Sequence, residues 1–344
     1  KVLLTMTSAN GCTDTISKTI QVYPQAAPAF TVNNLKQCLR GNSFVLTSTS
    51  TIASPSTLST YNWNYGNGTT TGASSTYNTR TYSYADTGVY KITLTTTSSN
   101  GCTDTVSKWV RVYPQASPSF SFNTQKQCLT GNAFVFTNAS TIASPGSPLT
   151  YSWNYGDGSA ATTSTNGSRT YTASGIYKVV LTTTSANGCT DTTSRTVQVY
   201  PQATRNISLN NYKQCLRTNN FVVTNTSTIT APGNMLKWSW NWGDGTTQTS
   251  DTAKSPSHVY TAAGIYQVIL TITSANGCTD TISKWVQVYP KATPSFSFNT
   301  QKQCLTGNAF VFTNASTIAS PGSPMTYSWN YGDGSAATTS TNGS

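Results

Sequence analysis

The 344-residue chain contains no glutamate, and all nine of its acidic residues are aspartates. Charged residues make up only 8% of the sequence, whereas helix surfaces normally carry glutamate, lysine and other strong helix formers. Threonine, valine and tyrosine, which favour strands, are abundant instead. No apolar run approaches the ~20 residues that a membrane-spanning helix needs. The composition predicts an all-β chain with no membrane span in this segment.

The residue types that catalysis usually requires are also scarce. His258 is the only histidine, and no cysteines form a CxxC pair, so neither a catalytic triad nor a zinc site is expected. Without glutamate or paired aspartates, a general acid and base are missing as well. We expect a structural role for His258, no metal site and no enzymatic activity in this segment.

The formal net charge is +11, but the lysines and arginines are spread along the chain without a run or cluster. A concentrated basic surface would predict binding to nucleic acid or to acidic glycans. The dispersed charge predicts a weakly charged surface with few acids, so we expect no nucleic-acid partner.

The chain is rich in internal repetition, which takes precedence in assigning its architecture. Residues 115–168 recur at 291–344 with only three substitutions. Within this long period the string Asn-Gly-Cys-Thr-Asp-Thr occurs four times, which gives a repeat of about 88 residues, the size of a small domain. The string begins at Asn10, Asn100, Asn187 and Asn276.

Two kinds of repeat alternate, because type A has a tryptophan at 109 and 285 where type B has Thr19 and Thr196. The predicted domains are 1–24 (the C-terminal part of a type B domain), 25–114 (type A), 115–201 (type B), 202–290 (type A) and 291–344 (the N-terminal part of a type B domain). Lys1 aligns with Lys178 and Ser344 with Ser168. Both ends are therefore expected to be cuts through a longer array.

One type B repeat, 115–201, shows the pattern of the strands. Alternation predicts strands at 119–122, 133–138, 151–155 and 189–200, a further strand through Tyr177, and short edge strands before Tyr171. Residues 125–132, which include Cys128, are expected to form a loop. About seven short strands in fewer than 100 residues predict two packed antiparallel sheets.

Each repeat has one tryptophan in the middle of a predicted strand, with aromatic neighbours two residues away. We expect these rings in the core of each sandwich, with sugar stacking as the alternative. They are Trp63, Trp153, Trp240 and Trp329.

The stretch from Tyr151 to Gly158, Tyr-Ser-Trp-Asn-Tyr-Gly-Asp-Gly, is similar to the Trp-Asp-Phe-Gly-Asp-Gly signature of the PKD (polycystic kidney disease) domain. The run from Tyr171 to Leu181 is similar to that family's Tyr…Gly-x-Tyr-x-Val-x-Leu pattern. The chain therefore resembles tandem PKD repeats of a large bacterial, Bacteroidota-like surface adhesin or extracellular filament protein. The resemblance implies Ig-like β-sandwiches stacked head to tail as a rod.

Some members of this family bind calcium, which makes Asp157, Asp244 and Asp333 candidate ligands. Calcium takes six to eight oxygen ligands, several of them charged. The later repeats offer only one such aspartate each, and the first complete repeat has Asn67 in its place. We expect these aspartates to stabilise a turn and the chain to hold no cofactor.

The eight cysteines recur at fixed positions, which indicates an oxidising, extracellular setting. In the Ig-like order implied by the resemblance, one cysteine lies at the bottom of each sandwich and the other at its top, too far apart for one bond. This predicts the inter-domain disulfides Cys38–Cys189 and Cys128–Cys278. Within-domain pairs (Cys38–Cys102 and Cys128–Cys189) or bonds between chains are the alternatives. The remaining cysteines are expected to pair outside the segment: Cys12, Cys102, Cys215 and Cys304.

Two surface signals remain. The Asp-Thr-apolar sequences resemble the O-glycosylation signal of Bacteroidota, with the start of a strand as the alternative interpretation; the candidate threonines are Thr15, Thr105, Thr192, Thr281 and Thr252. Trp109 and Trp285 should point outward, because Val110 and Val112 alternate with the first of them. They could contact a neighbouring domain or strand, or pack under the adjacent linker.

The predicted function is a structural or adhesive segment of a bacterial cell-surface or extracellular fibre. Its partners would be neighbouring PKD domains, other copies in a fibre and surface glycans. The alternative is a carbohydrate-binding or spacer array of a secreted glycan-degrading enzyme. Exposed aromatic platforms in every repeat would favour that alternative, but only type A repeats have the additional tryptophan.

Overall fold

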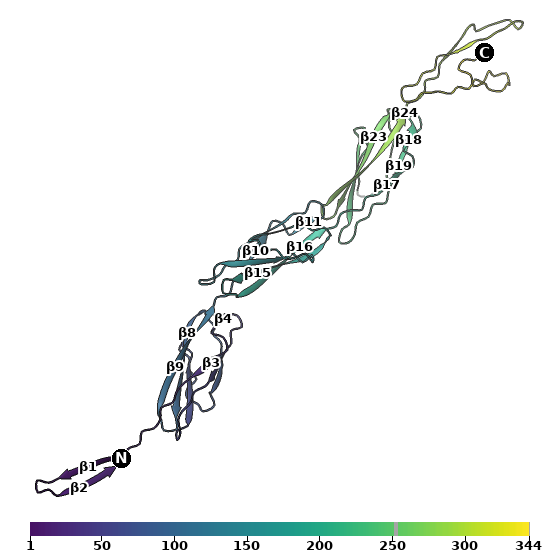
Figure 1. Cartoon of the computed structure of the whole chain (residues 1–344). Helices are drawn as coiled ribbons and strands as arrows, with labels where there is room; N and C mark the ends of the chain where they lie inside the picture. The colour runs from purple at the N-terminus through teal and green to yellow at the C-terminus, as the bar shows by residue number, and fades with distance from the viewer. Residues whose placement is uncertain (251–253, 344) are drawn as a thin grey trace. The chain divides into compact units, whose positions relative to one another are not determined.

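The computed structural model describes residues 1–250 and 254–343, and within these ranges every regular element is a β-strand (Figure 1). The predicted all-β class is therefore confirmed. Contacts divide the chain into two compact units. Unit 1 comprises Lys1–Asn123, Val135–Arg169 and Lys178–Thr196, and unit 2 comprises Thr124–Phe134, Thr170–Tyr177 and Val197–Ser344. The boundary between the units runs through the middle repeat.

Unit 1 begins with a hairpin and continues with the first complete repeat. The hairpin strands are β1 (Val2–Thr7) and β2 (Thr13–Lys18), which pair only with each other and are exposed throughout. The repeat has a sheet in the order β3-β5-β7 and a second in the order β4-β9-β8-β6. Its strands are β3 (Phe30–Val32), β4 (Lys36–Cys38), β5 (Phe44–Ser48), β6 (Leu58–Asn64), β7 (Thr79–Tyr82), β8 (Gly88–Ser98) and β9 (Thr103–Tyr113).

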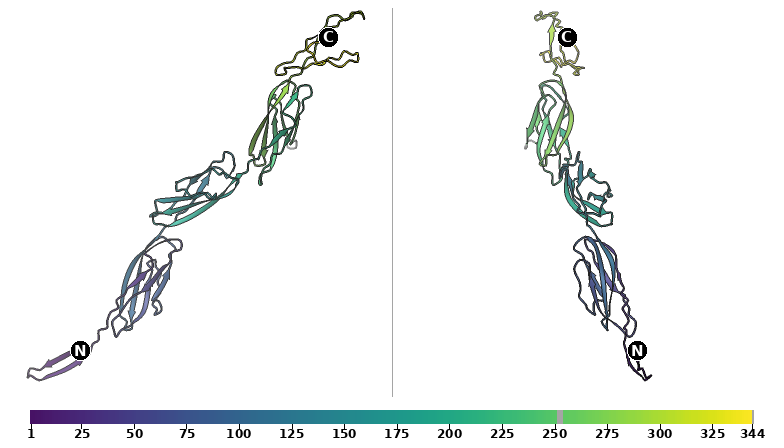
Figure 2. Two further views of the ribbon diagram at one scale, coloured as in Figure 1. Left: turned by 45° about the vertical axis from the view of Figure 1, so that its right-hand side comes forward. Right: turned by 90° about the vertical axis from the view of Figure 1, so that its left-hand side faces the viewer.

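The middle repeat has the same seven strands in the same order, β10-β12-β14 and β11-β16-β15-β13. They are β10 (Phe120–Phe122), β11 (Lys126–Cys128), β12 (Phe134–Asn138), β13 (Leu149–Asn154), β14 (Gly167–Arg169), β15 (Gly175–Ser185) and β16 (Thr190–Tyr200). The two layers of strands in a complete repeat can be followed from two further directions in Figure 2.

Unit 2 contains the third complete repeat and a two-stranded remainder. The repeat has the sheets β17-β19-β22 and β18-β24-β23-β20-β21, and the remainder is β25-β26. The strands are β17 (Ile207–Leu209), β18 (Lys213–Cys215), β19 (Phe221–Asn225), β20 (Met235–Asn241), β21 (Thr247–Ser250), β22 (Ser257–His258), β23 (Gly264–Ser274), β24 (Thr279–Tyr289), β25 (Phe296–Phe298) and β26 (Phe312–Asn314).

One predicted loop is a strand. Residues 126–128 form β11 and pair in parallel with β16, with Lys126 opposite Gln198 and Cys128 opposite Tyr200. The expectation of a loop at 125–132 was wrong for these residues. A three-residue strand is too short to show alternation, and the neighbouring long strand β16 supplies its hydrogen-bonding partners. The same parallel pair recurs as β4–β9 and β18–β24.

The core of each complete sandwich lies between its two sheets. Trp63, Trp153 and Trp240 are 0% exposed, as expected for core residues. In the first repeat the edge of one ring faces the other across the interface, with the Phe30 and Trp63 centroids 5.1 Å apart. The sandwich therefore buries its largest rings where the two layers meet.

Trp329 differs from its three counterparts, because it is only half-buried. In the described part of 291–343 only β25 and β26 form strands, so no equivalent of the long pair β15–β16 covers the ring. A core position for Trp329 stays a prediction.

The Gly-Asp-Gly turn depends on its first glycine. Gly156 has φ of +76°, and a Cβ there would lie 2.6 Å from the carbonyl oxygen of Lys178 on β15. Gly66 and Gly243 meet the same backbone in their own repeats. Only glycine allows both the left-handed backbone and this close approach to the neighbouring strand.

Candidate functional site: the disulfide junctions

In unit 1, the first repeat is joined to the middle repeat by a disulfide between Cys38 and Cys189. The S–S distance is 2.04 Å, and the Cα atoms are 5.5 Å apart. Cys38 ends β4, and the parallel pairing with β9 holds it opposite Tyr113. Cys189 lies in the turn before β16, where its backbone N–H donates to the hydroxyl of Ser185. One sulfur atom therefore comes from the end of a strand, and the other comes from the turn that precedes the return strand of a hairpin.

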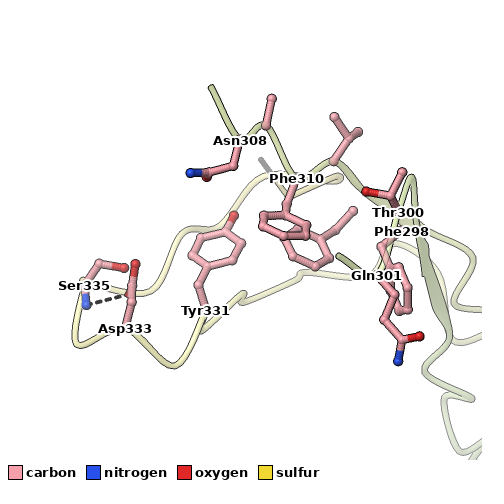
Figure 3. Close-up of a pocket in the computed structure, with 11 residues that line it drawn as sticks. Phe298, Thr300, Gln301, Asn308, Phe310, Tyr331, Asp333 and Ser335 are labelled. Carbon is pink, nitrogen blue, oxygen red and sulfur yellow. Dashed lines mark hydrogen bonds between the residues drawn. The ribbon is translucent and has the colours of Figure 1, made fainter. Parts of the chain in front are cut away.

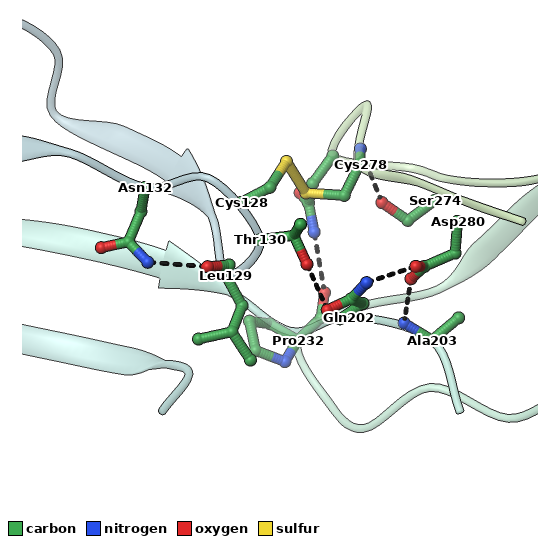
Figure 4. Close-up of a disulfide and its surroundings, with 11 residues drawn as sticks. Cys128, Leu129, Thr130, Asn132, Gln202, Ala203, Pro232, Ser274, Cys278 and Asp280 are labelled. Atoms are coloured by element: carbon green, nitrogen blue, oxygen red, sulfur yellow. Dashed lines mark hydrogen bonds between the residues drawn. A yellow bond between two sulfur atoms is a disulfide. The ribbon is translucent and has the colours of Figure 1, made fainter. Parts of the chain in front are cut away.

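In unit 2, Cys128 and Cys278 join the middle repeat to the third repeat in the same way (Figure 4). Their S–S distance is 2.07 Å and their Cα atoms are 5.6 Å apart. Cys128 ends β11, and the backbone N–H of Cys278 donates to the hydroxyl of Ser274. The structure thus brings together the two pairs that the strand order predicted. Cys12, Cys102, Cys215 and Cys304 are free thiols.

An ion pair accompanies the first junction. Arg40, two residues after Cys38, places its Nη1 atom 2.7 Å from Oδ1 of Asp191, two residues after Cys189. The arginine side chain is 70% exposed, so solvent screens the pair. The side-chain amide of Gln115 also donates to the carbonyl of Thr190. This junction therefore combines one covalent bond with a screened ion pair and one hydrogen bond.

A more buried network accompanies the second junction, centred on Asp280. One carboxylate oxygen accepts from the side-chain amide of Gln202, and the other accepts from the backbone N–H of Ala203 at 2.9 Å. The side chain of Asp280 is only 6% exposed. Gln202 in turn accepts a hydrogen bond from the hydroxyl of Thr130 (Figure 4). A buried carboxylate needs such donors, and Gln202 and Ala203 both belong to the segment that enters the third repeat. Nη1 of Arg205, in the same segment, also lies 3.8 Å from Oδ1 of Asp280.

The alternation of repeats corresponds to these two junctions. In the type A repeat Arg40 stands two positions after Cys38, and in the type B repeat Thr130 stands two positions after Cys128. The arginine reaches its aspartate directly, whereas the threonine reaches Asp280 through Gln202. The A–B pair is therefore a pair of junction chemistries as well as a pair of sequences.

Sequence reasoning missed a second set of contacts, which cross the sandwich near the Gly-Asp-Gly turn. Asp157 forms an ion pair with Arg169 at 2.5 Å, and Asp244 lies 2.7 Å from Nε2 of His258. In the first repeat the amide of Asn67 donates to the hydroxyl of Tyr82 instead. A sequence signal was present, because the residue at the partner's position differs between the three complete repeats. It is Tyr82 beside Asn67, Arg169 beside Asp157 and His258 beside Asp244.

These contacts also set the ionisation of the turn aspartates. Partial burial opposes ionisation of Asp157, but hydrogen bonds from Ser159 and Arg169 outweigh it and lower the pKa of the carboxyl. Burial likewise opposes ionisation of Asp244, and hydrogen bonds from Thr246 and His258 lower its pKa. Both aspartates therefore stabilise the turn as carboxylates, with their oxygens already in use by the protein.

No group of three or more histidine, cysteine, aspartate or glutamate side chains gathers as a metal site among residues 1–250 and 254–343. The same described ranges contain no helix that is long and apolar enough to cross a membrane.

The other predicted surface residues are placed as follows. Trp109 and Trp285 are 61% and 60% exposed, and a role for them in an interface remains a prediction. The candidate O-glycosylation sites are the threonines that follow the repeated aspartate. Four of them are exposed: Thr15, Thr105, Thr192 and Thr281. The backbone N–H groups of the first three donate to the side chain of the preceding aspartate. Thr252 lies outside the described residues.

Two-layered Ig-like sandwiches in tandem, joined by disulfides, define the class of this protein. Sequence comparison matches the PKD domain over residues 25–112, 115–199 and 207–288, well over half of the chain, and the chain therefore belongs to the PKD domain family. PKD domains and disulfides are typical of extracellular or surface proteins, and tandem PKD domains are typically non-catalytic.

Several solved structures are similar to parts of the chain. The PKD1 domain of Vibrio anguillarum Epp is 32% identical, covering 25% of this chain and 93% of its own, with a TM-score of 0.22. The PKD1 domain of the Vibrio cholerae metalloprotease PrtV is 30% identical, covering 26% and 98%, with a TM-score of 0.21. A Ca2+-stabilised adhesin with which an Antarctic bacterium binds ice is 15% identical, covering 83% and 80%, with a TM-score of 0.32.

Proposed function

We propose that this chain is a structural or adhesive segment of a bacterial cell-surface or extracellular fibre, in which disulfides join each PKD domain to the next. The observation that carries the proposal is the pair of disulfides Cys38–Cys189 and Cys128–Cys278, each of which joins two consecutive repeats. A fibre in which each domain must be held in place against the next needs such junctions, whereas a set of independent binding domains does not.

The magnitude of the constraint supports a structural role. The two disulfides close loops with sequence separations of 151 and 150 residues. The chain-entropy relation for a loop of this length gives about 5 kcal/mol of stabilisation per bond at 25 °C. Because each loop includes parts of two repeats, unfolding of one repeat is restrained by its neighbour. The domain boundaries 25–114, 115–201 and 202–290 belong to this proposal, as does a rod-like arrangement.

Glycosylation at the exposed Asp-Thr sequences is a further part of the proposal. Thr15, Thr105, Thr192 and Thr281 are accessible on the first residues of the return strand. Sugars there would lie close to the cysteine three positions earlier in each repeat, which is Cys12, Cys102, Cys189 or Cys278. Peptide mass mapping of protein from the native cell tests this: hexose-containing mass on tryptic peptides with Thr105 supports it, and unmodified peptides reject it.

A carbohydrate-binding array of a secreted enzyme is the second candidate, because Trp109 and Trp285 are exposed. An exposed ring can stack on an apolar sugar face. Glycan-array binding that is lost in the double variant W109A/W285A, with the disulfides intact, would favour this candidate over the fibre.

The principal test uses intact cells. A non-permeant biotin reagent is applied, the labelled chain is purified without reductant, and its disulfides are mapped. Labelling together with the peptides Cys38–Cys189 and Cys128–Cys278 is the expected result, and small-angle X-ray scattering should then give an extended particle. A chain protected from the reagent, with all eight thiols reduced, would contradict the proposal.

A further inference from the structure

The hollow in segment 291–343 corresponds to the interior of a sandwich. It has a volume of about 860 Å³ and is lined by Phe310 and Tyr331 among others (Figure 3). Their counterparts in the middle repeat are core residues that are 0–1% exposed: Phe134 and Tyr155. This hollow therefore carries no ligand site, and the outer faces of the complete repeats are the better candidates.

The outer face of the four-stranded sheet in the first complete repeat carries a tryptophan with cations around it. Trp109 lies on β9, directly opposite Lys91 on β8. Arg111, two positions further along β9, lies opposite Val89 on β8 and opposite Lys36 on β4. Alternate residues of a strand and directly opposite residues share one face of a sheet, and all five side chains are exposed. Strand pairing thus gathers three cations that are dispersed in the sequence.

We call these five residues the basic tryptophan face: Lys36, Val89, Lys91, Trp109 and Arg111. Directly opposite residues have Cβ atoms about 5 Å apart, and alternate residues of one strand lie about 7 Å apart. The indole of Trp109, which is 61% exposed, therefore has one cation beside it and two in the adjacent row.

The positive charge of this face is not neutralised within the repeat. No ion pair in residues 1–250 and 254–343 involves Lys36, Lys91 or Arg111. Residues 25–114 contain six lysines and arginines and two aspartates, which leaves a net charge of +4 (six minus two). Asp86 precedes β8, and Asp104 alternates with the outward residues of β9. The face is therefore complementary in charge to an anionic ligand.

A row of small polar residues adjoins the basic tryptophan face. Asn64, Thr93 and Ser107 lie side by side on β6, β8 and β9, in the row beyond Lys91 and Trp109. The hydroxyl oxygens of Thr93 and Ser107 are 2.9 Å apart. Single-stranded nucleic acid is held by several aromatic rings on which successive bases stack, whereas sugars need hydrogen-bonding groups beside one ring. The arrangement favours a saccharide over a nucleic acid.

The third repeat keeps the ring and loses the cations beside it. Trp285 is 60% exposed, but Gln267 and Gln287 stand at the positions of Lys91 and Arg111. Its outer face therefore offers an aromatic platform with amides instead of charges.

The middle repeat keeps one of the cations and loses the ring. Lys178 stands at the position of Lys91, and Thr196 stands at the position of Trp109. Of the three complete repeats, the first alone combines the exposed ring with Lys91 and Arg111.

We propose that the basic tryptophan face binds an acidic polysaccharide, with the indole of Trp109 against a sugar ring and Lys91 and Arg111 on its carboxylates. The proposal rests on the adhesive part of the proposed function and names the class of its ligand. Ammonium and guanidinium groups form charge-assisted hydrogen bonds with carboxylates, and an exposed ring covers the apolar face of a sugar. Because the groups are exposed, each contact is weak and is screened by salt.

Isothermal titration calorimetry of the 344-residue chain with a galacturonic acid oligosaccharide tests the proposal. One site per chain is expected at about 0.01 M salt, and affinity should fall about tenfold at about 0.1 M, where the Debye length is about 10 Å instead of about 30 Å. The fully methyl-esterified oligosaccharide keeps the sugar rings and loses the charge, so it should bind about tenfold more weakly.

Residues of the other repeats supply the variants. Lys91→Gln combined with Arg111→Gln gives the first repeat the residues of the third, and should weaken binding about tenfold. Trp109→Thr gives it the residue of the middle repeat, with a similar loss. The matched control is Lys126→Gln combined with Lys178→Gln, which removes the same charge from the middle repeat and should change affinity less than about twofold.

The reverse exchange tests whether the same residues suffice to make a site. Gln267→Lys combined with Gln287→Arg places the two cations beside Trp285, and the stoichiometry should rise from one site per chain to two. Each replacement residue already occurs at the equivalent position of another repeat, so the fold is expected to be kept, which circular dichroism checks.

The proposal is overturned if the chain does not bind the oligosaccharide, or if the free and esterified forms bind equally. It is also overturned if the control pair weakens binding as much as Lys91→Gln with Arg111→Gln, or if an oligothymidylate of equal charge binds more tightly than the oligosaccharide. These outcomes leave the fibre itself untouched, because disulfide mapping and labelling on intact cells do not depend on the ligand.

Discussion

The contrast between two tryptophans of the first repeat gives a quantitative test of the fold. Trp63 is 0% exposed, lies edge-on to Phe30 and donates its indole N–H to the carbonyl of Tyr77 at 2.7 Å. Trp109 is 61% exposed on the outer face of β9. The same substitution at both sites removes the same atoms, so the difference in stability reports the burial of Trp63 together with its hydrogen bond to Tyr77.

Replacement of a buried tryptophan by alanine costs about 3–5 kcal/mol, because it leaves a cavity and here also deprives a carbonyl of its donor. Replacement of an exposed surface residue is usually within about 0.5 kcal/mol. At about 1.4 kcal/mol per factor of ten, Trp63→Ala should increase opening of the first repeat by a factor of roughly 10² to 10⁴, and Trp109→Ala by less than about threefold.

Hydrogen exchange measured by mass spectrometry resolves this effect, because it reads each repeat separately within one molecule. Peptides from β8 and β9 report the substituted repeat, and peptides from β23 and β24 of the third repeat serve as an internal standard. The reasoning is refuted if Trp63→Ala accelerates exchange less than tenfold, or if Trp109→Ala accelerates it as much.

Three further predictions follow from the junctions and turns. Asp280→Ala should destabilise the third repeat by about 1–3 kcal/mol, since Gln202 and the Ala203 N–H lose a buried acceptor, and Asp280→Asn, which keeps one acceptor oxygen, should cost less in urea denaturation. Gly158→Ala should cost about 1–2 kcal/mol through its left-handed backbone, and Gly156→Ala should cost more because its Cβ also meets β15; equal melting temperatures would contradict this. Because folding lowers the pKa of Asp157, its contribution is present above the unfolded pKa of ~3.9 and is lost as the pH falls through the lower folded pKa, so melting between about pH 5 and 2 should be less pH-dependent in Asp157→Asn.

The strands could be predicted where alternation and burial act together. Trp63 and Trp153 were recognisable because each lies between aromatic neighbours in the middle of a predicted strand, and long strands such as β15 show a clear inward face. The three-residue strand β11 was not recognisable, because its pairing depends on β16, about seventy positions away. Local pattern carries no information about such a partner.

At the candidate junctions, too, some features could be predicted from the sequence and others depend on residues far apart in the chain. The repeat period and the Ig-like order implied by the resemblance placed the cysteines at opposite ends of consecutive domains, which favoured bonds between domains but left within-domain and inter-chain pairs as alternatives. The contacts beside them were missed, because Arg40 and Asp191 lie 151 positions apart and nothing in the local sequence links them. Asp280 has the same local sequence as Asp191, and only the fold shows that Asp280 accepts from Gln202 and the Ala203 N–H, whereas Asp191 meets Arg40.

The two disulfides have overlapping spans, because Cys128 lies between Cys38 and Cys189, and Cys189 lies between Cys128 and Cys278. Between Cys38 and Cys278 there are consequently two covalent routes past every peptide bond. A protease that cuts once anywhere in this region leaves both fragments attached to each other. Separating Cys38 from Cys278 requires a cut in each of the three intervals 38–128, 128–189 and 189–278, or a reductant. The interleaved pairing thus gives the chain redundancy that separate bonds within each domain would not provide.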